Sequence, residues 1–195
     1  MSDASLRLFF LRHGETSWNR EGRLQGQHDI PLNDLGRAQA EEAGRRLMTL
    51  TDPKALPWVA SPLSRTVETA QLARREIGLP EDDFLRDDRL KELAFGRWEG
   101  LTWKEVRQSD PQRAAQREKD KWQTVPPDGE SYNLLSQRLA PWLGSVAGDW
   151  VVVAHGGVAR VLLHDIAGVA PHEAAELDIW QGRVLVLEKG RYEWV

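Results

Sequence analysis

The chain has 195 residues, and none of them is a cysteine. This absence excludes disulfide bonds and metal sites built from thiolate ligands. Long apolar runs are absent as well. The run at residues 8–11 is too short for the core of a secretory signal and leads directly into Arg12 and His13. No segment approaches the length that crosses a bilayer, so we expect a cytoplasmic protein with no membrane partner.

An excess of basic residues is also absent. The 26 lysines and arginines are outnumbered by 30 aspartates and glutamates, which gives a formal net charge of −4. A protein that binds nucleic acid through a broad basic surface has the opposite balance. We therefore expect no nucleic-acid partner. The net charge leaves room for a local cluster of arginines, because it does not say where they lie.

The composition is that of a globular domain. Hydrophobic residues make up 41% and charged residues 29% of the chain, and its length is sufficient for one sizeable core. We find no internal repeat, no low-complexity tract and no domain boundary. The sequence therefore predicts a single domain over residues 1–195, with an insertion at about 93–130.

Short apolar runs alternate along the chain with segments whose apolar residues recur at helical spacing. Continuous apolar runs are typical of strands buried on both faces. The alternation predicts an α/β fold with three layers, α/β/α, in which helices cover both faces of a mostly parallel central sheet. The predicted strands are residues 6–11, 58–60, 150–154 and 183–187, and the predicted helices include about 34–50, a helix starting at 61–62, and 157–166.

The segment at residues 103–128 departs from this alternation. It is polar and charged, and prolines at 111, 126 and 127 interrupt it. We expect a pair of surface helices here. Insertions at strand ends often cover a site, so the same segment is a candidate cap.

Cationic and titratable side chains follow three of the predicted strands. Arg12 and His13 follow the first, Arg65 lies just beyond the second, and His155 follows the third. The carboxyl ends of parallel strands meet at one edge of a sheet, so we expect these four residues to converge. Helix N-termini after two of the strands would add backbone N–H donors. Because clustered cations repel one another, the sequence predicts a bound anion.

Three segments carry a resemblance to a known family: residues 12–16 (RHGET), 61–70 (SPLSRTVETA) and 154–157 (AHGG). Together and in this order they resemble the histidine phosphatase superfamily. The resemblance implies that His13 attacks phosphorus and becomes phosphorylated. It also implies that Arg12, Arg65 and His155 bind the phosphoryl oxygens in place of a metal ion, so no metal or other cofactor is expected.

A fourth segment, residues 90–100 (LKELAFGRWEG), resembles the stretch that supplies the general acid in this superfamily. Its glutamate corresponds to Glu92, which would protonate the leaving oxygen and later act as a base on water. Glu99 is the second candidate for this role. The resemblance further implies a phosphate pocket lined by Asn19, Gln25, Gly26 and Gly156.

The resemblance leaves the reaction and the substrate open. Mutases of the superfamily carry a Tyr-Gly pair shortly after the acid and paired arginines in a longer insertion. This chain has Phe95-Gly96 instead, and Arg113 and Arg117 are separated. We therefore expect hydrolysis of a small phosphomonoester, with a phosphoglycerate mutase and a phosphohistidine-protein phosphatase as alternatives. A phosphate-binding domain without activity would lack part of the catalytic set, whereas this chain has all of the predicted catalytic residues. Homodimers are common in the superfamily, so a homodimer is a candidate state for this chain, but the sequence does not determine its oligomeric state.

Overall fold

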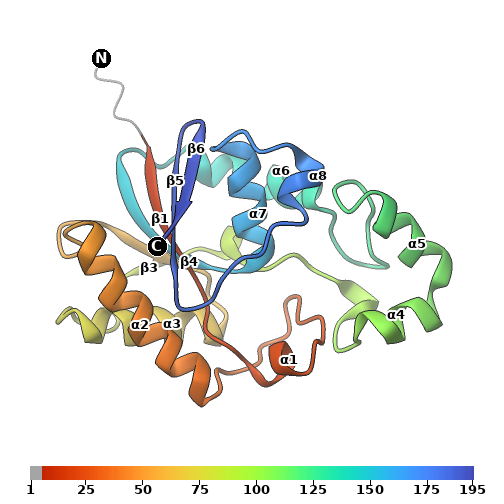
Figure 1. Cartoon of the computed structure of the whole chain (residues 1–195), viewed down its shortest axis with the longest axis horizontal. Coiled ribbons are helices and arrows are strands. Elements are labelled where there is room, and N and C mark those ends of the chain that lie inside the picture. Colours follow the sequence, from red (N-terminus) through yellow and green to blue (C-terminus); the bar gives the residue numbers. More distant parts are fainter. Residues whose placement is uncertain (1–5) are drawn as a thin grey trace.

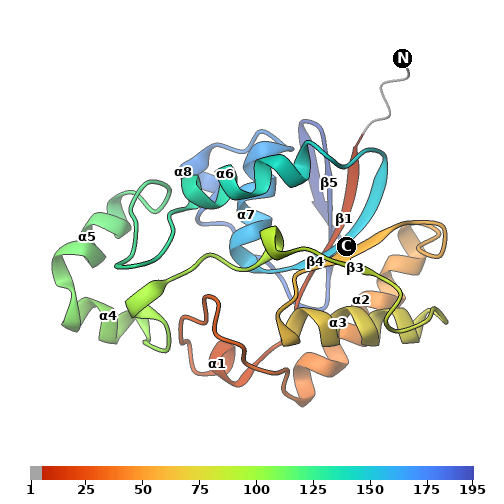
Figure 2. The same cartoon turned by 180° about the vertical axis from the view of Figure 1, so that it is seen from behind.

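The computed structural model describes residues 6–195 and contains a six-stranded sheet with helices on both sides (Figures 1 and 2). The strand order is β3-β2-β4-β1-β5-β6. The strands are β1 (Arg7–Arg12), β2 (Trp58–Ala60), β3 (Leu85–Arg86), β4 (Asp149–Ala154), β5 (Val184–Glu188) and β6 (Arg191–Trp194). The α-helices are α1 (Ser17–Arg20), α2 (Asp34–Leu50), α3 (Ser64–Glu76), α4 (Trp103–Ser109), α5 (Pro111–Lys119), α6 (Tyr132–Leu143), α7 (Gly156–Asp165) and α8 (Pro171–Ala174). Two 3₁₀ turns, η1 (Asp88–Leu90) and η2 (Gly96–Trp98), precede α4.

The sheet is mostly parallel, as the sequence predicts. Strand β4 pairs in parallel with both β1 and β2, and β2 pairs in parallel with β3. Only β5 and β6 run antiparallel to their neighbours. The sequence did not predict β3 and β6, because β3 has two residues and the side chains of β6 are mainly exposed. As a result, the carboxyl ends of β2, β4 and β1 lie next to one another.

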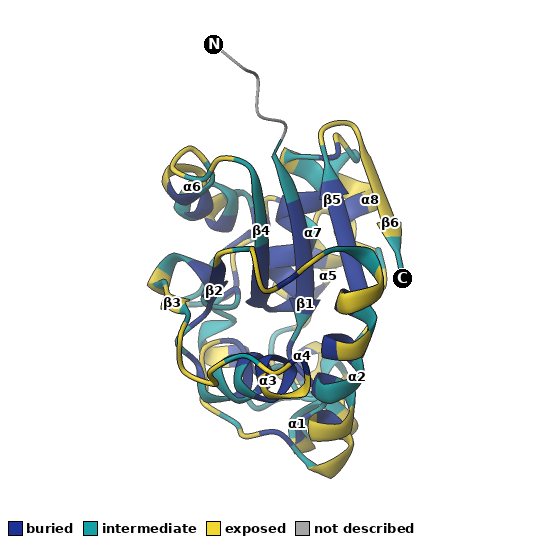
Figure 3. Cartoon of the chain, turned by 90° about the vertical axis from the view of Figure 1, so that its left-hand side faces the viewer, coloured by how far each residue is buried: buried dark blue, intermediate teal, exposed yellow. Residues whose placement is uncertain are grey.

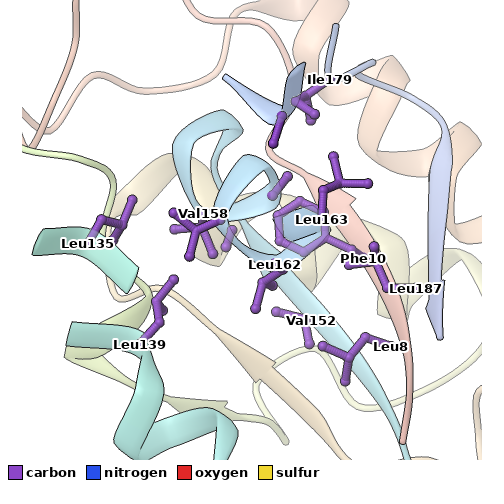
Figure 4. Packing of buried hydrophobic residues seen from close by; sticks show 14 of the residues in the cluster. Leu8, Phe10, Leu135, Leu139, Val152, Val158, Leu162, Leu163, Ile179 and Leu187 are labelled. Atoms are coloured by element: carbon purple, nitrogen blue, oxygen red, sulfur yellow. The ribbon is translucent and has the colours of Figure 1, made fainter. Parts of the chain in front are cut away.

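Alternating side chains of β1 enter two separate cores, one on each face of the sheet. Leu8 and Phe10 belong to a core with residues of α6 and α7, part of which is shown in Figure 4. Phe9 and Leu11 point the other way and pack with residues of α2 and α3. All four are at most 1% exposed. Figure 3 shows the same division, with buried strands between helices whose outer sides are exposed. This alternation produces the three layers predicted from the sequence.

The helix boundaries follow local capping chemistry. Asn33 caps α2: its side chain accepts a hydrogen bond of 2.8 Å from the Gly36 N–H. The predicted start of the next helix at 61–62 is wrong, since α3 begins at Ser64. Ser61 instead prolongs the pairing of β2 with β4, because its N–H donates to the Val153 carbonyl.

The polar segment forms the expected pair of surface helices, α4 and α5, at one end of the molecule (Figure 1). It has a small core of its own around Trp98, Val106 and Ala114. Two backbone hydrogen bonds attach it to the loop that follows α1: the Leu24 N–H donates to the Leu101 carbonyl, and the Gly100 N–H donates to the Leu24 carbonyl. Within residues 6–195, no helix has the length and apolar character needed to cross a membrane.

Candidate active site

One cavity of about 150 Å³ opens at the carboxyl ends of β1 and β4. The structure brings almost all of the sequence-predicted site residues to its wall. These are Arg12, His13, Asn19, Gln25, Gly26, Arg65, Glu92 and Gly156.

His13 is held as a neutral imidazole with one nitrogen free. Its Nδ1 lies 2.8 Å from the Gly14 carbonyl oxygen, and a carbonyl oxygen only accepts, so we assign the proton to Nδ1. Burial lowers the pKa of His13 well below 6.5, and the positive charges of Arg65 and Arg12 lower it further. The neutral ring then carries its lone pair on Nε2, which has no hydrogen-bond partner in residues 6–195.

His155 is fully buried directly beside His13, with ring centroids 5.2 Å apart. Its Nε2 is hydrogen-bonded to the Ser61 hydroxyl at 2.8 Å, and its Nδ1 has no partner. Burial lowers the pKa of His155 well below 6.5, with Arg65 as the next largest cause. Both imidazoles are therefore uncharged at neutral pH, and His155 packs against His13 rather than forming the cavity wall.

Acidification is expected to destabilise the fold through these two histidines. The unfolded chain takes up protons near pH 6.5, whereas His13 and His155 resist protonation in the folded chain. Their contribution to stability is therefore present above pH 6.5 and lost as the pH falls below it. We expect the free energy of unfolding to fall by about 1–2 kcal/mol per histidine between pH 7 and pH 5. Urea titration of the wild type and His155→Gln at both pH values measures the part of this fall that His155 contributes. The exposed His172→Gln is the control, and an unchanged pH dependence in His155→Gln would contradict the assignment.

Arg12 and Arg65 are held in place by backbone carbonyls and not by carboxylates. Arg12 Nη1 donates to the Ile179 carbonyl at 2.7 Å, and Arg65 donates to the carbonyls of His28 and Gly26 at 2.7 and 2.8 Å. Burial lowers the pKa of Arg12 to about 10, with nearby Arg160 as the second cause. Burial also lowers the pKa of Arg65. Arg12 therefore stays charged at neutral pH, and neither arginine has a salt-bridge partner within the described chain.

Buried polar atoms without partners gather around this cavity. Only six buried side-chain nitrogen or oxygen atoms in residues 6–195 lack a hydrogen bond. Four of the six belong to predicted site residues: Arg12 Nε, Arg65 Nε, His155 Nδ1 and Gln25 Oε1. An unpaired buried polar group costs about 1–3 kcal/mol. Such a concentration is typical of a site whose ligand supplies the missing partners.

Glu92 lies at the N-terminus of α7. Its carboxylate accepts hydrogen bonds from the N–H groups of Gly157, at 3.0 Å, and Leu93, at 2.8 Å. This contact needs a glycine at 157, because a Cβ there would lie 2.3 Å from Glu92 Oε1. The N-terminal donors predicted for an anion are thus partly taken by the protein itself. The same holds at α3, where Asp29 accepts from the Ser64 N–H.

A fully bonded arginine fixes the segment that carries Glu92. Arg138 of α6 donates to the carbonyls of Arg89, Lys91 and Glu92 at 2.6–3.2 Å. It also binds the Glu130 carboxylate through two nitrogens, both at 2.9 Å. These hydrogen bonds hold the backbone of residues 89–92 in place, which limits the movement of Glu92.

Glu99, the second candidate acid, has a different task. Its carboxylate accepts from the N–H groups of Gln27 and Phe95 and pairs with the His28 ring. It approaches Gly26 so closely that a Cβ there would lie 1.9 Å from Glu99 Oε1. Glu99 therefore braces the loop whose carbonyls hold Arg65, and it does not line the cavity.

Sequence reasoning missed some of the lining residues. Arg160 and Tyr132 line the cavity without having been predicted, and so does Arg23. Arg160 follows Gly156 by four positions in α7, so both lie on one face of that helix. This spacing is visible in the sequence. Tyr132, from the start of α6, has no comparable signal.

A family model of the histidine phosphatase superfamily (branch 1) matches residues 8–195. The chain belongs to this superfamily. It is 35% identical over 176 residues to a glucosyl-3-phosphoglycerate phosphatase from Mycolicibacterium vanbaalenii, covering 84% of this chain and 75% of that protein. It is also 35% identical over 165 residues to a metal-independent phosphoserine phosphatase from Arabidopsis thaliana, covering 80% and 66%. The crystal structure of the α-ribazole phosphatase from Shigella flexneri superposes with a TM-score of 0.79 at 25% identity, covering 92% and 89%.

Proposed function

We propose that this member of the histidine phosphatase superfamily hydrolyses small phosphomonoesters through a phosphohistidine intermediate on His13. One observation carries the proposal: a neutral imidazole with a free Nε2 faces a cavity that it shares with the guanidinium groups of Arg12 and Arg65. This arrangement combines a nucleophile with positive charge where a phosphate would bind.

The reaction has two steps. In the first, the lone pair of His13 Nε2 forms a bond to phosphorus. The bond to the ester oxygen breaks, and that oxygen takes up a proton from the Glu92 carboxyl. In the second, Glu92 removes a proton from water, the water oxygen attacks phosphorus, and the bond from phosphorus to nitrogen breaks. Inorganic phosphate leaves, and His13 returns to its neutral state.

Removal of divalent metals is expected to leave the hydrolysis rate unchanged. The positive charge that a metal ion would supply to the phosphoryl oxygens is provided here by Arg12 and Arg65. The measurement compares p-nitrophenyl phosphate hydrolysis before and after dialysis against EDTA, with EDTA then removed. A loss of activity that magnesium, manganese or zinc restores would contradict the proposal.

The size of the cavity favours a small substrate. A volume of about 150 Å³ is below the 300–1,000 Å³ that is usual for drug-sized ligands. It encloses a phosphate and a few further atoms. The segment 93–130 contributes Leu93 and Phe95 to the wall. We propose that this segment covers the cavity as a cap and belongs to the same single domain as the sheet. The relatives named as phosphatases of phosphorylated metabolites support the same substrate class.

Hydrolysis is favoured over the mutase reaction by the positions of Arg113 and Arg117, the two arginines of α5. Arg113 is exposed on α5 and does not line the cavity. Arg117 is buried behind the rings of Phe95 and Tyr132, and its Nη1 donates to the Thr124 carbonyl. Neither residue therefore presents a guanidinium group to a second substrate in the cavity.

A further inference from the structure

Arg160 is a cation of the cavity wall for which the proposed chemistry has no use. Its Nε donates to the Leu177 carbonyl at 3.1 Å, which orients the side chain. Its two terminal nitrogens have no acceptor within residues 6–195. A Cβ on Gly156 would lie 3.5 Å from Arg160 Nη1 and 3.7 Å from Arg12 Nε. The two guanidinium groups therefore flank the same glycine, and Arg160 is within reach of a ligand held by Arg12.

The unpaired arginines of the protein are concentrated here. Of the arginines in residues 6–195 that are not exposed, all but four form a salt bridge. The four are Arg12, Arg65, Arg117 and Arg160. The positive charge of Arg160 lowers the pKa of both Arg12 and Arg117. Arg160 is thus electrostatically coupled to the phosphate-binding arginine on one side and to the buried arginine of α5 on the other.

A single phosphate held by Arg12 and Arg65 leaves the terminal nitrogens of Arg160 without an acceptor of their own. A phosphate dianion matches Arg12 and Arg65. Glu92 is the one carboxylate among the described lining residues, and it accepts hydrogen bonds from the N–H groups of Gly157 and Leu93 and none from Arg160. Carboxylates outside the lining, such as Asp178, add negative charge near Arg12, but none of those described forms a salt bridge with Arg160.

Arg117 is covered by aromatic rings, and Arg23 of the cavity wall is paired with Glu21 and Glu105. Among the described lining residues, Arg160 is therefore the unpaired cation that remains for an additional anion. Uncompensated charges of one sign at close range are unfavourable.

We propose that Arg160 forms a second anion subsite that binds a further anionic group, a carboxylate or a second phosphate, on the substrate itself. This inference rests on the proposed function and narrows it to phosphomonoesters that carry such a group close to the transferred phosphate. The guanidinium fork suits both groups, because it can donate two parallel hydrogen bonds to either.

The test compares esters that differ in this group alone. Phosphoglycolate carries a carboxylate, ethylene glycol bisphosphate carries a second phosphate, and 2-hydroxyethyl phosphate carries neither. We expect the wild type to prefer at least one of the doubly anionic esters over 2-hydroxyethyl phosphate by about 10- to 100-fold in kcat/KM. In Arg160→Gln this preference is expected to fall nearly to one, and Arg160→Lys is expected to keep part of it. Arg113→Gln, which removes an unpaired arginine outside the cavity, is the matched control and should keep the full preference.

Two results would overturn the subsite. One is a wild type that does not distinguish the three esters. The other is an Arg160→Gln variant that loses the same factor on all three, which would place Arg160 on the transferred phosphate. Dissociation constants of the three esters for the His13→Ala protein provide the same comparison without turnover. If the wild type hydrolyses none of the three esters, but the His13→Ala protein still prefers the doubly anionic ones and loses this preference when Arg160 is also replaced, the proposed reaction fails and the subsite stands.

Discussion

Replacing His13 with alanine is expected to lower kcat/KM for p-nitrophenyl phosphate by about 10⁴-fold or more. The variant loses the nitrogen that forms the bond to phosphorus. The remaining cavity binds phosphate through Arg12 and Arg65 but has no neutral imidazole positioned to attack, because His155 is buried behind it and hydrogen-bonded to Ser61. The measurement is the hydrolysis rate of purified protein, with the exposed His172→Ala variant as the control.

A second readout separates the nucleophile from a residue that only binds phosphate. Brief reaction with ³²P-labelled substrate followed by alkaline quenching is expected to leave label on the wild type. That label should be lost in acid, because a bond from phosphorus to an imidazole nitrogen is acid-labile. His13→Ala should carry none. Activity at the wild-type level in His13→Ala, or acid-labile label that persists on it, would mean that another residue attacks phosphorus.

The residues at the strand ends could be predicted because their positions follow from two simple regularities. Continuous apolar runs mark strands buried on both faces, and parallel strands bring their carboxyl ends to one edge. Arg12 ends β1 and His13 directly follows it, while His155 directly follows β4, the neighbour of β1 in the sheet. Arg65 follows β2, the other neighbour of β4. Once the strands are assigned, the convergence of these residues requires no further information.

The choice between the two glutamates could not be made from the sequence in the same way. Glu92 and Glu99 belong to one irregular segment, in which no helical or strand period fixes the direction of a side chain. The structure separates them through long-range contacts: Glu92 meets the N-terminus of α7, and Glu99 meets the loop at residues 26–28. For the same reason, the sequence did not reveal that the N–H of Gly157 is occupied by a carboxylate of the protein.

The edges of the sheet were missed for a different reason. Strand β3 is too short to show a period, and β6 (RYEW) has mainly exposed side chains. Apolar patterning detects burial, and edge strands are the least buried part of a sheet. These are the two outermost strands of the sheet, and neither carries a predicted site residue, so the site was predictable even though the complete sheet was not.

Glu92→Gln is expected to slow hydrolysis of esters with poor leaving groups by about 10²- to 10⁴-fold. The amide keeps the shape of the side chain and an oxygen for the N–H groups of Gly157 and Leu93, but it has no acidic proton to give to an alkoxide. Hydrolysis of p-nitrophenyl phosphate should fall much less, since p-nitrophenolate leaves without being protonated. The measurement is kcat for 2-hydroxyethyl phosphate and p-nitrophenyl phosphate in the wild type and the variant.

Three further variants distinguish proton transfer from a loss of structure. Gly157→Ala should share the dependence on the leaving group, because the new Cβ displaces the Glu92 carboxyl without removing it. Gly144→Ala, where a Cβ meets only ordinary contacts, is the control for adding a methyl group near a helix end. Glu99→Gln loosens the loop that holds Arg65 and should therefore slow the hydrolysis of both substrates by a similar factor. If Glu92→Gln also slows both substrates equally, Glu92 supports the cavity without donating the proton, and the acid must come from another group or from water.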